Sequence, residues 1–425
     1  MRQWMVAAKK ADFYVIAEKF HVDPVVARII RNREVIGEKN IRIYLGGNLS
    51  DLSDPHQMKD MDRLVEILAQ KIRKQVHIRI IGDYDVDGVT SSHLFLTALR
   101  RVGAKVDVVI PHRIQDGYGL SLHLLQQAKE DGVDTILTCD NGIAAIDEIA
   151  WAKAQKMTVL VTDHHAVPFE EHEGRRTEKK SLADAVVNPH QQDCGYPYKE
   201  LCGAGVAWNV IRVLYENYDM DKREAEDLLD FVAMATVCDV MSLTGENRIL
   251  VKEGLKRIRH TKNIGLQALM QACNVQPENI SAYHFGYVLG PCVNATGRLD
   301  TARHALRLFE TGQETEAEEI ARDLVDLNQE RKELTLQGVE MAKKLCEEGG
   351  YENDPVLVLF LPDVHESIAG LIAGRIREMY NRPVFVLTRG EEGVKGSGRS
   401  TENYSMYENT VSYTHLRAHE TREDL

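Results

Sequence analysis

Three aspartates at alternate positions mark the segment Gly82–Gly88, which reads Gly-Asp-Tyr-Asp-Val-Asp-Gly. They follow a run rich in β-branched residues, 76–81, which is typical of a buried strand. Carboxylates packed this closely repel one another, so the arrangement costs stability unless a cation neutralises it. A divalent metal is the usual counter-charge, and oxygen ligands suit hard ions such as Mg²⁺ and Mn²⁺. The spacing therefore indicates a metal site.

Further acids follow three other apolar runs. Asp140 follows 135–139, Asp163 follows 158–162 together with His164 and His165, and Asp239 follows 231–238. For a single aspartate, capping of the next helix is the simpler explanation. The combination of Asp83, Asp85, Asp87, Asp140, Asp163 and Asp239 with two adjacent histidines is hard to explain by capping alone.

Mixed carboxylate and imidazole ligands fit Mn²⁺ well. A pair of ions about 3.5–4 Å apart can hold both the attacking and the leaving oxygen of a phosphoryl displacement. Neighbouring side chains after a strand point to different sides, so His164 and His165 need not both bind metal. We favour His164 as the ligand, and we expect His165 to be a second-sphere donor or a contact to the scissile phosphate.

Strand-like and helix-like segments alternate after residue 76, which predicts βαβ units and a parallel sheet. The predicted strands are 77–81, 105–110, 135–139 and 158–162, and the predicted helices between them are 90–102, 121–130 and 144–154. Ligands of such sheets bind beyond the carboxyl ends of the strands. The acids named above lie at those ends.

The remaining segments predict an α/β protein with a helical extension and a second, smaller unit. Residues 14–75 and 203–270 are expected to be mostly helical, and the polar stretch 170–180 is expected to be a surface loop. A long amphipathic helix is predicted over 314–348, ended by two glycines. A smaller α/β unit follows, with strand 356–361, helix 367–380 and strand 383–388. The long helix is best interpreted as a connector between the two units.

Two glycine-containing segments, Asn294–Arg298 and Gly396–Ser400, are candidate anion sites, because glycines free backbone N–H groups and Arg matches phosphate in a bidentate way. The alternative for each is an ordinary turn with a solvated Arg. The glycine-rich run Cys202–Ala207 enters a helix, and we favour close packing over phosphate contact there. Arg113, just after the strand 105–110, is a candidate phosphate ligand, although a surface Arg is the default.

The composition limits the other possibilities. The chain has 425 residues, 28% of them charged, and a net charge of −13, which argues against non-specific coating of nucleic acid but leaves room for a local basic groove. No apolar run approaches the roughly 18 residues that a membrane span needs, and the N-terminus does not have the pattern of a secretory signal. Seven scattered cysteines indicate reduced thiols, so we expect a cytoplasmic protein without a membrane partner.

In order and combination, these motifs resemble those of the DHH phosphoesterase family, over roughly residues 20 to 408. The similarity is greatest to its single-strand-specific 5′→3′ exonucleases. The resemblance rests on Ile81–Gly88, Asp140–Gly142, Asp163–His165, Val187–Pro189, Leu201–Ala207, Asp239–Val240, Asn294–Arg298 and Gly396–Ser400. Each segment alone is weak evidence, whereas the ordered set is specific.

The resemblance implies the roles of particular residues. The centre for two Mn²⁺ or Mg²⁺ ions would consist of Asp83, Asp85, Asp87, Asp140, His164, His165 and Asp239. Five of these, Asp85, Asp87, Asp140, His164 and His165, would be catalytic. The 5′ end of the substrate and its path would be contacted by Arg113, Asn294, Arg298, His365, Gly396, Ser397, Gly398 and Arg399. Single-stranded DNA would be the substrate, with a single-strand-binding protein and a helicase as further partners.

The resemblance also implies a domain organisation. We expect a helical extension over 1–75, a DHH catalytic domain over 76–312, a connector helix over 313–350 and a partial DHH-associated domain over 351–409. Residues 410–425 resemble an adapter-derived translation and are interpreted as a non-native tail, so we expect a truncated product. Cys292 stands where the family usually has Arg, and Glu366-Ser367 replaces a usual small or Gly step.

Three functions compete at this point. The first is a metal-dependent hydrolase that releases 5′-mononucleotides from single-stranded DNA in the 5′→3′ direction, in DNA repair and recombination. The second is a phosphodiesterase of the same superfamily that acts on short oligonucleotides or cyclic dinucleotides. The third is a non-catalytic replication scaffold, which is disfavoured because such relatives typically lose metal ligands and every acid is present here.

Overall fold

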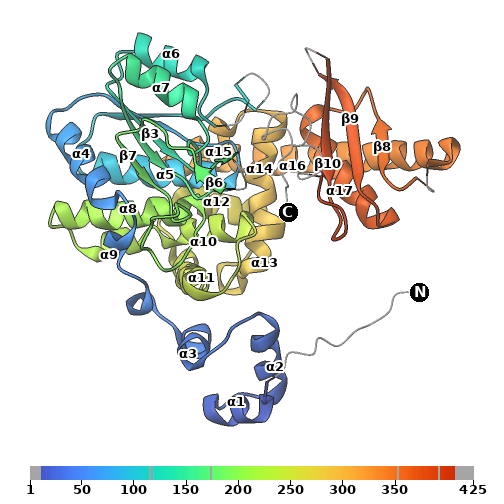
Figure 1. The fold of residues 1–425 in the computed structure, drawn as a ribbon, viewed down its shortest axis with the longest axis horizontal. Coiled ribbons are helices and arrows are strands. Elements are labelled where there is room, and N and C mark those ends of the chain that lie inside the picture. The colour runs from blue at the N-terminus through green and yellow to red at the C-terminus, as the bar shows by residue number, and fades with distance from the viewer. Residues whose placement is uncertain are drawn as a thin grey trace.

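The computed structural model describes residues 11–113, 116–117, 119–172, 175–351, 354–390 and 393–406, and it has a mixed α/β fold (Figure 1). The strands are β1 (Ile78–Ile81), β2 (Val106–Val109), β3 (Thr135–Cys139), β4 (Thr158–Thr162), β5 (Phe169–His172), β6 (Arg175–Glu178), β7 (Ala185–Val187), β8 (Leu357–Phe360), β9 (Val384–Gly390) and β10 (Gly393–Arg399).

The helices are distributed along the whole described chain. They are α1 (Phe13–Phe20), α2 (Pro24–Asn32), α3 (Glu38–Gly46), α4 (Met61–Arg73), α5 (Val86–Arg101), α6 (Leu122–Glu130), α7 (Ile146–Ala154), α8 (Gly203–Asn217), α9 (Lys222–Glu226), α10 (Leu229–Cys238), α11 (Gly245–Arg257), α12 (Ile264–Ala272), α13 (Ala282–His284), α14 (Gly290–Leu299), α15 (Ala302–Glu310), α16 (Glu314–Gly349) and α17 (Ala369–Tyr380). A π-helical stretch, η5 (Phe285–Leu289), joins α13 to α14, and a 3-10 turn, η7 (Glu366–Ile368), precedes α17.

The central sheet is parallel and has the strand order β2-β1-β3-β4-β7. Its strands are nearly continuous apolar runs because both faces are covered by helices. Alternate residues of each strand point to opposite faces. Ile80 therefore joins the large core with α4, α5 and α8, while the next residue, Ile81, joins a separate core with α6 and α7. The carboxyl ends of β1, β3 and β4 meet at one edge, which is where the predicted acids lie.

Helices α8 and α10 bring two further segments to this edge. Both pack against α5, the helix that follows β1. Almost the whole of α10 is apolar and buried, which fits a helix in the interior of the core rather than on its surface. Its burial places the residue after its last turn, Asp239, beside the sheet edge.

A smaller unit lies next to the main body, which comprises the elements from α4 to α15, and is joined to it by α16 (Figure 1). Its sheet has the order β10-β9-β8, with β8 and β9 parallel and β9 and β10 antiparallel. Helix α16 spans both units: its first half packs on α12 and α14, and its second half contributes Val339, Ala342 and Cys346 to the core of the small unit. The helix ends at Gly350, whose φ of 69° lies in the left-handed region that glycine adopts without strain.

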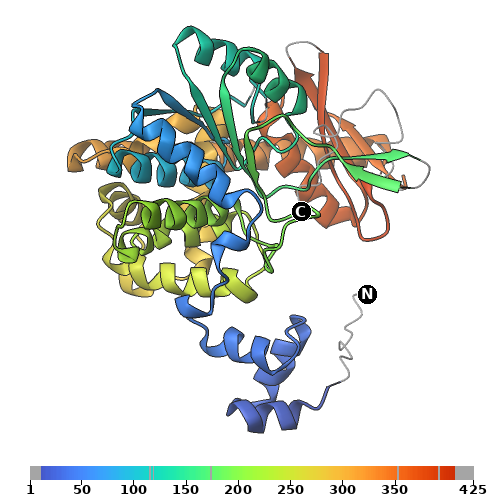
Figure 2. The ribbon, with the colours of Figure 1, turned by 60° about the vertical axis from the view of Figure 1, so that its left-hand side comes forward.

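The N-terminal helices α1, α2 and α3 form a separate small group. They extend from the main body in both ribbon views (Figures 1 and 2). Ile30, Val35, Ile41 and Tyr44 make a core of their own. The Arg248 side chain of α11 lies 3.8 Å from the Tyr44 ring centroid. This cation–π contact attaches the N-terminal group to the main body.

The predicted fold class is confirmed, and most predicted strands and helices agree with the structure within a few residues. Two differences concern local structure. The polar stretch 170–180 was expected to be a loop, but it lies largely in the antiparallel pair β5 and β6. Helix α5 begins at Val86 instead of residue 90, because Asp85 caps it from inside the acid motif. The predicted tail at 410–425 lies outside the described residues.

In the part of the chain that the structure describes, no helix combines the length and the apolar character that crossing a bilayer requires.

Candidate metal centre

The acid loop between β1 and α5 presents Asp83, Asp85 and Asp87 at the sheet edge. Asp83 and Asp87 are each only 1% exposed. The Asp85 carboxylate accepts a hydrogen bond from the Gly88 N–H (3.0 Å) and so caps α5. A side chain at Gly88 would place its Cβ 2.4 Å from the carbonyl oxygen of Asp83, so the tight loop depends on glycine there. Asp85 thus acts as a helix cap and remains close to the other acids.

The N-terminus of α8 binds the Asp87 carboxylate. Backbone N–H groups of Gly203 and Ala204 donate hydrogen bonds to it, at 2.6 and 2.8 Å. These are two of the N–H groups that a helix N-terminus leaves unpaired, and they carry its partial positive charge. A Cβ at Gly203 would lie 2.6 Å from the Cβ of Asp140, so this helix approaches the acids closely only because the residue is glycine. The glycine-rich run Cys202–Ala207 therefore allows close packing, as the sequence indicates. Its backbone N–H groups also support Asp87.

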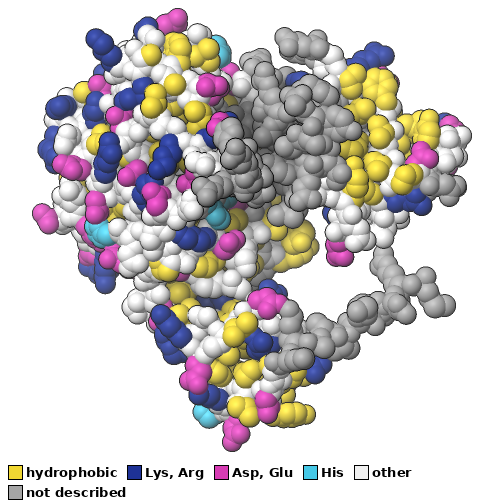
Figure 3. Space-filling view, viewed as in Figure 1, with side chains coloured by type: hydrophobic (Ala, Val, Ile, Leu, Met, Phe, Trp, Pro, Cys, Tyr) yellow, Lys and Arg dark blue, Asp and Glu magenta, His cyan; other side chains and the backbone are white. Residues whose placement is uncertain are grey.

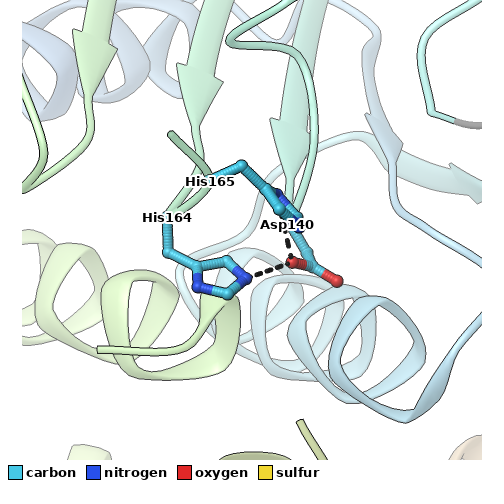
Figure 4. A group of neighbouring side chains, drawn as sticks. All are labelled: Asp140, His164 and His165. Atoms are coloured by element: carbon cyan, nitrogen blue, oxygen red, sulfur yellow. Dashed lines mark ion pairs between the residues drawn. The ribbon is translucent and has the colours of Figure 1, made fainter. Parts of the chain in front are cut away.

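Asp140 and the two histidines form the group drawn in Figure 4. Asp140 follows β3 with a φ of 60°, and its side chain is buried. His164 Nε2 lies 3.0 Å from Asp140 Oδ1, and it also lies 3.6 Å from Asp87 Oδ2 and 3.6 Å from Asp239 Oδ2. His164 is thus the side chain that touches acids from three separate elements.

Asp163 has a different role from the other acids. Its carboxylate accepts hydrogen bonds from the N–H groups of Ile143 (2.8 Å), His164 (2.7 Å) and His165 (3.0 Å), and from Nδ1 of His165 (2.7 Å). Burial opposes ionisation of Asp163, but His165 and His164 outweigh it and hold the pKa of this carboxyl well below its usual range. Asp163 therefore orients the two histidines and does not point into the acid cluster.

The seven predicted ligands converge into three overlapping groups. In each group, one possible ligand atom per residue lies within 4.8 Å of the others: Asp140 with His164 and His165, Asp87 with His164 and Asp239, and Asp83 with Asp85 and Asp140. Asp140 and His164 each belong to two groups, and of these two only the Asp140 carboxylate, with its two oxygens, could serve more than one ion, because His164 Nε2 has a single lone pair. Five carboxylates and an imidazole or two form a donor set that fits Mn²⁺ or Mg²⁺ in chemistry and in number.

The electrostatics of the site also fit a cation. Burial and the neighbouring Asp85 raise the pKa of Asp87 to about 6, although the amides of Ala204 and Gly203 lower it. Burial and the charges of Asp87 and Asp85 raise the pKa of Asp140 well above its ordinary value. A bound divalent ion would lower both pKa values again, because it stabilises the ionised carboxylates.

Two of the predicted substrate residues, Arg113 and Asn294, contact the acid loop. A third, Arg298, connects α14 to the small unit. The Arg113 guanidinium lies over the Tyr84 ring, 4.8 Å from its centroid. The Asn294 side chain accepts a hydrogen bond from the Val86 N–H (3.1 Å). Arg298 Nη1 donates to the Ser367 carbonyl (2.7 Å) and so joins α14 to the small unit.

The two candidate anion segments, Asn294–Arg298 and Gly396–Ser400, were considered as turns. The structure places most of each in a helix or a strand instead. Asn294–Arg298 lies within α14, and a Cβ at Gly297 would lie 2.4 Å from the Tyr84 carbonyl, so this glycine lets α14 pack on the acid loop. Gly396–Arg399 lies in β10, paired with β9. Helical hydrogen bonds occupy the backbone groups of Asn294–Arg298, whereas β10 is an edge strand that pairs with β9 on one side only. In α14 the candidate anion ligands are therefore side chains.

The predicted residues of the small unit gather around the start of α17. His365 Nδ1 lies 2.6 Å from the Ser367 hydroxyl in η7. Arg399 donates to the Ser397 hydroxyl (3.2 Å) and to the Gly398 carbonyl (2.8 Å). Gly396 and Gly398 allow close packing of the β10 backbone, since added Cβ atoms would lie 2.4 Å from the Leu387 side chain and from the Met406 sulfur.

Sequence reasoning did not assign three of the supporting contacts. The position of Asp163 next to two histidines predicted another acid of the cluster, whereas its orienting role depends on the turn that brings Ile143 N–H to it. The hydrogen bonds from α8 to Asp87 join residues more than a hundred positions apart, which no local pattern reveals. Ser367 was noted only as a departure from the family pattern, yet its carbonyl receives Arg298.

Comparison with known proteins agrees with this fold and site. Residues 77–236 match the family model described as DHH family, N-terminal domain. The "Single-stranded-DNA-specific exonuclease RecJ" of Haemophilus influenzae is 36% identical over 397 residues, which cover 90% of this chain and 67% of the relative. The protein of the same name from Bacillus subtilis is 33% identical over 395 residues, covering 92% of this chain and 48% of the relative.

The fold is also that of a solved structure. The crystal structure of RecJ in complex with Mn²⁺ from Thermus thermophilus matches with a TM-score of 0.78 at 29% identity, covering 95% of this chain and 56% of that one. The sheet and its acid edge thus define a DHH-type protein. The chain belongs to the RecJ family. It spans between about half and two thirds of the length of these relatives.

Replacing Gly203 by Ala tests whether the approach of α8 supports the metal site. The added methyl group meets Asp140 at 2.6–3.0 Å, so α8 must move away and its hydrogen bonds to Asp87 lengthen. We expect Mn²⁺ affinity to fall at least about tenfold, the size of a typical outer-shell effect, when it is measured by isothermal titration calorimetry. The matched control is Gly205→Ala in the same helix, where the nearest atoms lie at 3.4 Å and belong to a side chain. Equal Mn²⁺ affinities in the two variants would contradict this account.

The raised pKa values predict how stability depends on pH and metal. Without metal, folded Asp87 keeps a proton that the unfolded chain has already released, so the free energy of unfolding falls as pH rises from about 4 through about 6. Asp140, whose pKa is also raised, contributes with the same sign. Asp163 has the opposite sign, but its contribution is lost only below the ordinary carboxylate pKa. Bound Mn²⁺ favours the ionised forms, so the rise in Tm that it causes should be larger near pH 7.5 than near pH 5. Thermal unfolding with Mn²⁺ and with a chelator measures this, and a metal-induced rise that is largest near pH 5 would refute it.

Proposed function

We propose that this chain is a metal-dependent exonuclease that hydrolyses phosphodiester bonds of single-stranded DNA from the 5′ end and releases 5′-mononucleotides. The observation that supports it most is the convergence of five carboxylates and two imidazoles from four segments, in a chain whose relatives are named single-stranded-DNA-specific exonucleases.

The proposed ligands of two Mn²⁺ or Mg²⁺ ions are Asp83, Asp85, Asp87, Asp140, His164 and Asp239, with Asp140 and His164 at the positions shared between groups. When bound, the ions would lower the pKa of a water nucleophile and stabilise the leaving oxygen. Asp87 is held in place by α8 before any substrate binds, so the site is already organised.

His165 is proposed to serve the phosphate instead of the metal. Its Nδ1 lies 2.7 Å from Asp163 Oδ1, a contact that fixes the orientation of the ring. An imidazole oriented in this way can contact a phosphate oxygen through a ring N–H. This supports the phosphate contact as its role and makes Asp163 a positioning residue.

The 5′ end is proposed to lie between the acid loop and the small unit. Arg113 lies over Tyr84 of the acid loop, and Arg298 bridges to Ser367. Ser397 and Arg399 lie beside Gly370 in the first turn of α17, three residues after Ser367. Arginines and a hydroxyl suit a terminal phosphate and so would set the polarity of digestion. Asn294, His365, Gly396 and Gly398 support these groups.

The wider context is part of the same proposal. We propose the domain division at 75/76, 312/313 and 350/351, a role in DNA repair and recombination, and action together with a single-strand-binding protein and a helicase. The seven cysteines, all within the described ranges, are free thiols, which supports a location in the reducing cytoplasm.

The direct test is digestion of 5′-labelled and 3′-labelled single strands with Mn²⁺. We expect the 5′ label to be released first as a mononucleotide. Asp140→Ala should lower the rate by more than about a hundredfold, since even the loss of an outer-shell partner costs 10–100-fold. Earlier release of the 3′ label would refute the polarity. A dinucleotide turned over faster than a long strand would instead favour an oligonucleotide phosphodiesterase.

Gly370→Ala tests the proposed 5′-phosphate site. The added methyl group would lie 2.7 Å from Arg399 Nη2 and 2.8 Å from Ser397 Oγ, both ends of flexible side chains, so the fold should tolerate it while the two side chains move. We expect an unchanged Tm and a several-fold rise in KM for 5′-phosphorylated strands, with little change for 5′-hydroxyl strands. The control is Gly374→Ala one turn later, where the nearest contact is an ordinary 3.9 Å. A Gly370→Ala variant that retains the full preference for a 5′ phosphate would contradict this assignment.

A further inference from the structure

Two exposed tyrosines stack on each other on the continuous stretch formed by α13 and η5. Tyr283, in α13, is 62% exposed and Tyr287, in η5, is 72% exposed. Their ring centroids lie 5.1 Å apart with an interplanar angle of 25°. The edge-on ring of His284 supports Tyr283 at 5.7 Å, and Nδ1 of His284 is itself 3.0 Å from the Ser281 hydroxyl. The pair is therefore an ordered aromatic surface that is open to solvent.

This aromatic surface lies on the segment that packs against the end of α10. The Cys238 thiol donates a hydrogen bond to the Phe285 carbonyl (3.3 Å), and a Cβ at Gly286 would be in contact with Val237 at 3.4 Å. Cys238 is followed by Asp239, which lies 3.6 Å from His164 in the metal centre. The residue after Asp239, Val240, is 76% exposed. The segment that carries the tyrosines is thus packed against the same helix end that carries Asp239 to the metal centre.

The charge of the chain makes such a surface useful to a nucleic-acid enzyme. The net charge of the chain is −13. On the face shown in Figure 3, the Lys and Arg side chains of the main body are mixed with Asp and Glu side chains. Phosphate contacts are therefore expected at local clusters of basic side chains, such as the proposed 5′ site, and not over this face as a whole. Aromatic rings hold unpaired bases by stacking, which tolerates any sequence because every base has a π-face.

We propose that Tyr283 and Tyr287 form a stacking platform for unpaired bases of the strand whose end occupies the metal centre, an inference that rests on the proposed function. Bases in a duplex are already stacked on their neighbours, so the platform favours single strands. A dinucleotide held at the metal centre has no further base that could stack on the platform. The platform therefore acts on strand length and strandedness and not on the chemical step.

The test compares a Tyr283→Ala/Tyr287→Ala double variant with a double Phe variant that keeps both rings. For single strands longer than about 16 nucleotides we expect KM of the Ala variant to rise about fivefold or more, with kcat unchanged. KM for a dinucleotide should not change. Because stacking involves no counterion release, the fold-change should be similar at low and moderate salt. The Phe variant should behave as the parent does, and so should Tyr14→Ala, which removes a 77% exposed tyrosine from α1.

A second readout does not require catalysis. Anisotropy of a fluorescent single strand, measured with a chelator present, should show the same fold-loss of affinity in the Ala variant, with an unchanged Tm. Parent and Ala variant with equal affinity and equal KM would overturn the platform while leaving the exonuclease intact. A Phe variant as defective as the Ala variant would also overturn it. A parent chain that binds strands but cuts none would refute the proposed function and leave the anisotropy comparison to decide the platform.

Discussion

The repulsion between buried carboxylates at one edge of the parallel sheet is the constraint on which the rest of this structure depends. Asp83, Asp87 and Asp140 are almost completely removed from water, where like charges at short range cost the most. The protein offsets part of this cost itself. The α8 N-terminus supplies two amides to Asp87, and His164 contacts acids from three elements. The raised pKa values of Asp87 and Asp140 show that these contacts leave the cluster short of positive charge, which is the condition a divalent ion satisfies.

The same region links the metal centre to the small unit through one helix. Asn294 and Gly297 of α14 contact the acid loop, and Arg298, the next residue, donates to the small unit at Ser367. Helix α16 provides a second, longer connection, because its two halves belong to different cores. The position of the small unit is therefore coupled to the geometry of the acid loop by contacts and not only by chain connectivity. A substrate group held by both units would depend on this coupling.

Membership of the RecJ family agrees with both features, since the family model covers the sheet with its acid edge and the Thermus structure extends the likeness over nearly the whole chain. The likeness does not depend on every family residue. Cys292 departs from the Arg that the resemblance implies at this position, and its sulfur accepts a hydrogen bond from Asn328 of α16 (3.5 Å). The α14–α16 packing is thus compatible with this replacement, and the contacts of α14 to the acid loop persist beside it.

The sequence by itself determined the α/β class, the strands β1 to β4, the long helix and the acids at the ends of these elements. These features follow from local rules: apolar runs, helical periodicity and the clustering of like charges that needs a cation. It could not determine how α14 and β10 use their glycines, because Asn294–Arg298 and Gly396–Ser400 look like turns until neighbouring elements make the helix and the strand more stable. Only the tertiary structure decided that the Ile143 N–H reaches Asp163, that α8 supports Asp87 and that η5 packs against the end of α10. Each of these is a contact that depends on how separate segments pack, and packing free energy is a property of the whole core that no local pattern encodes.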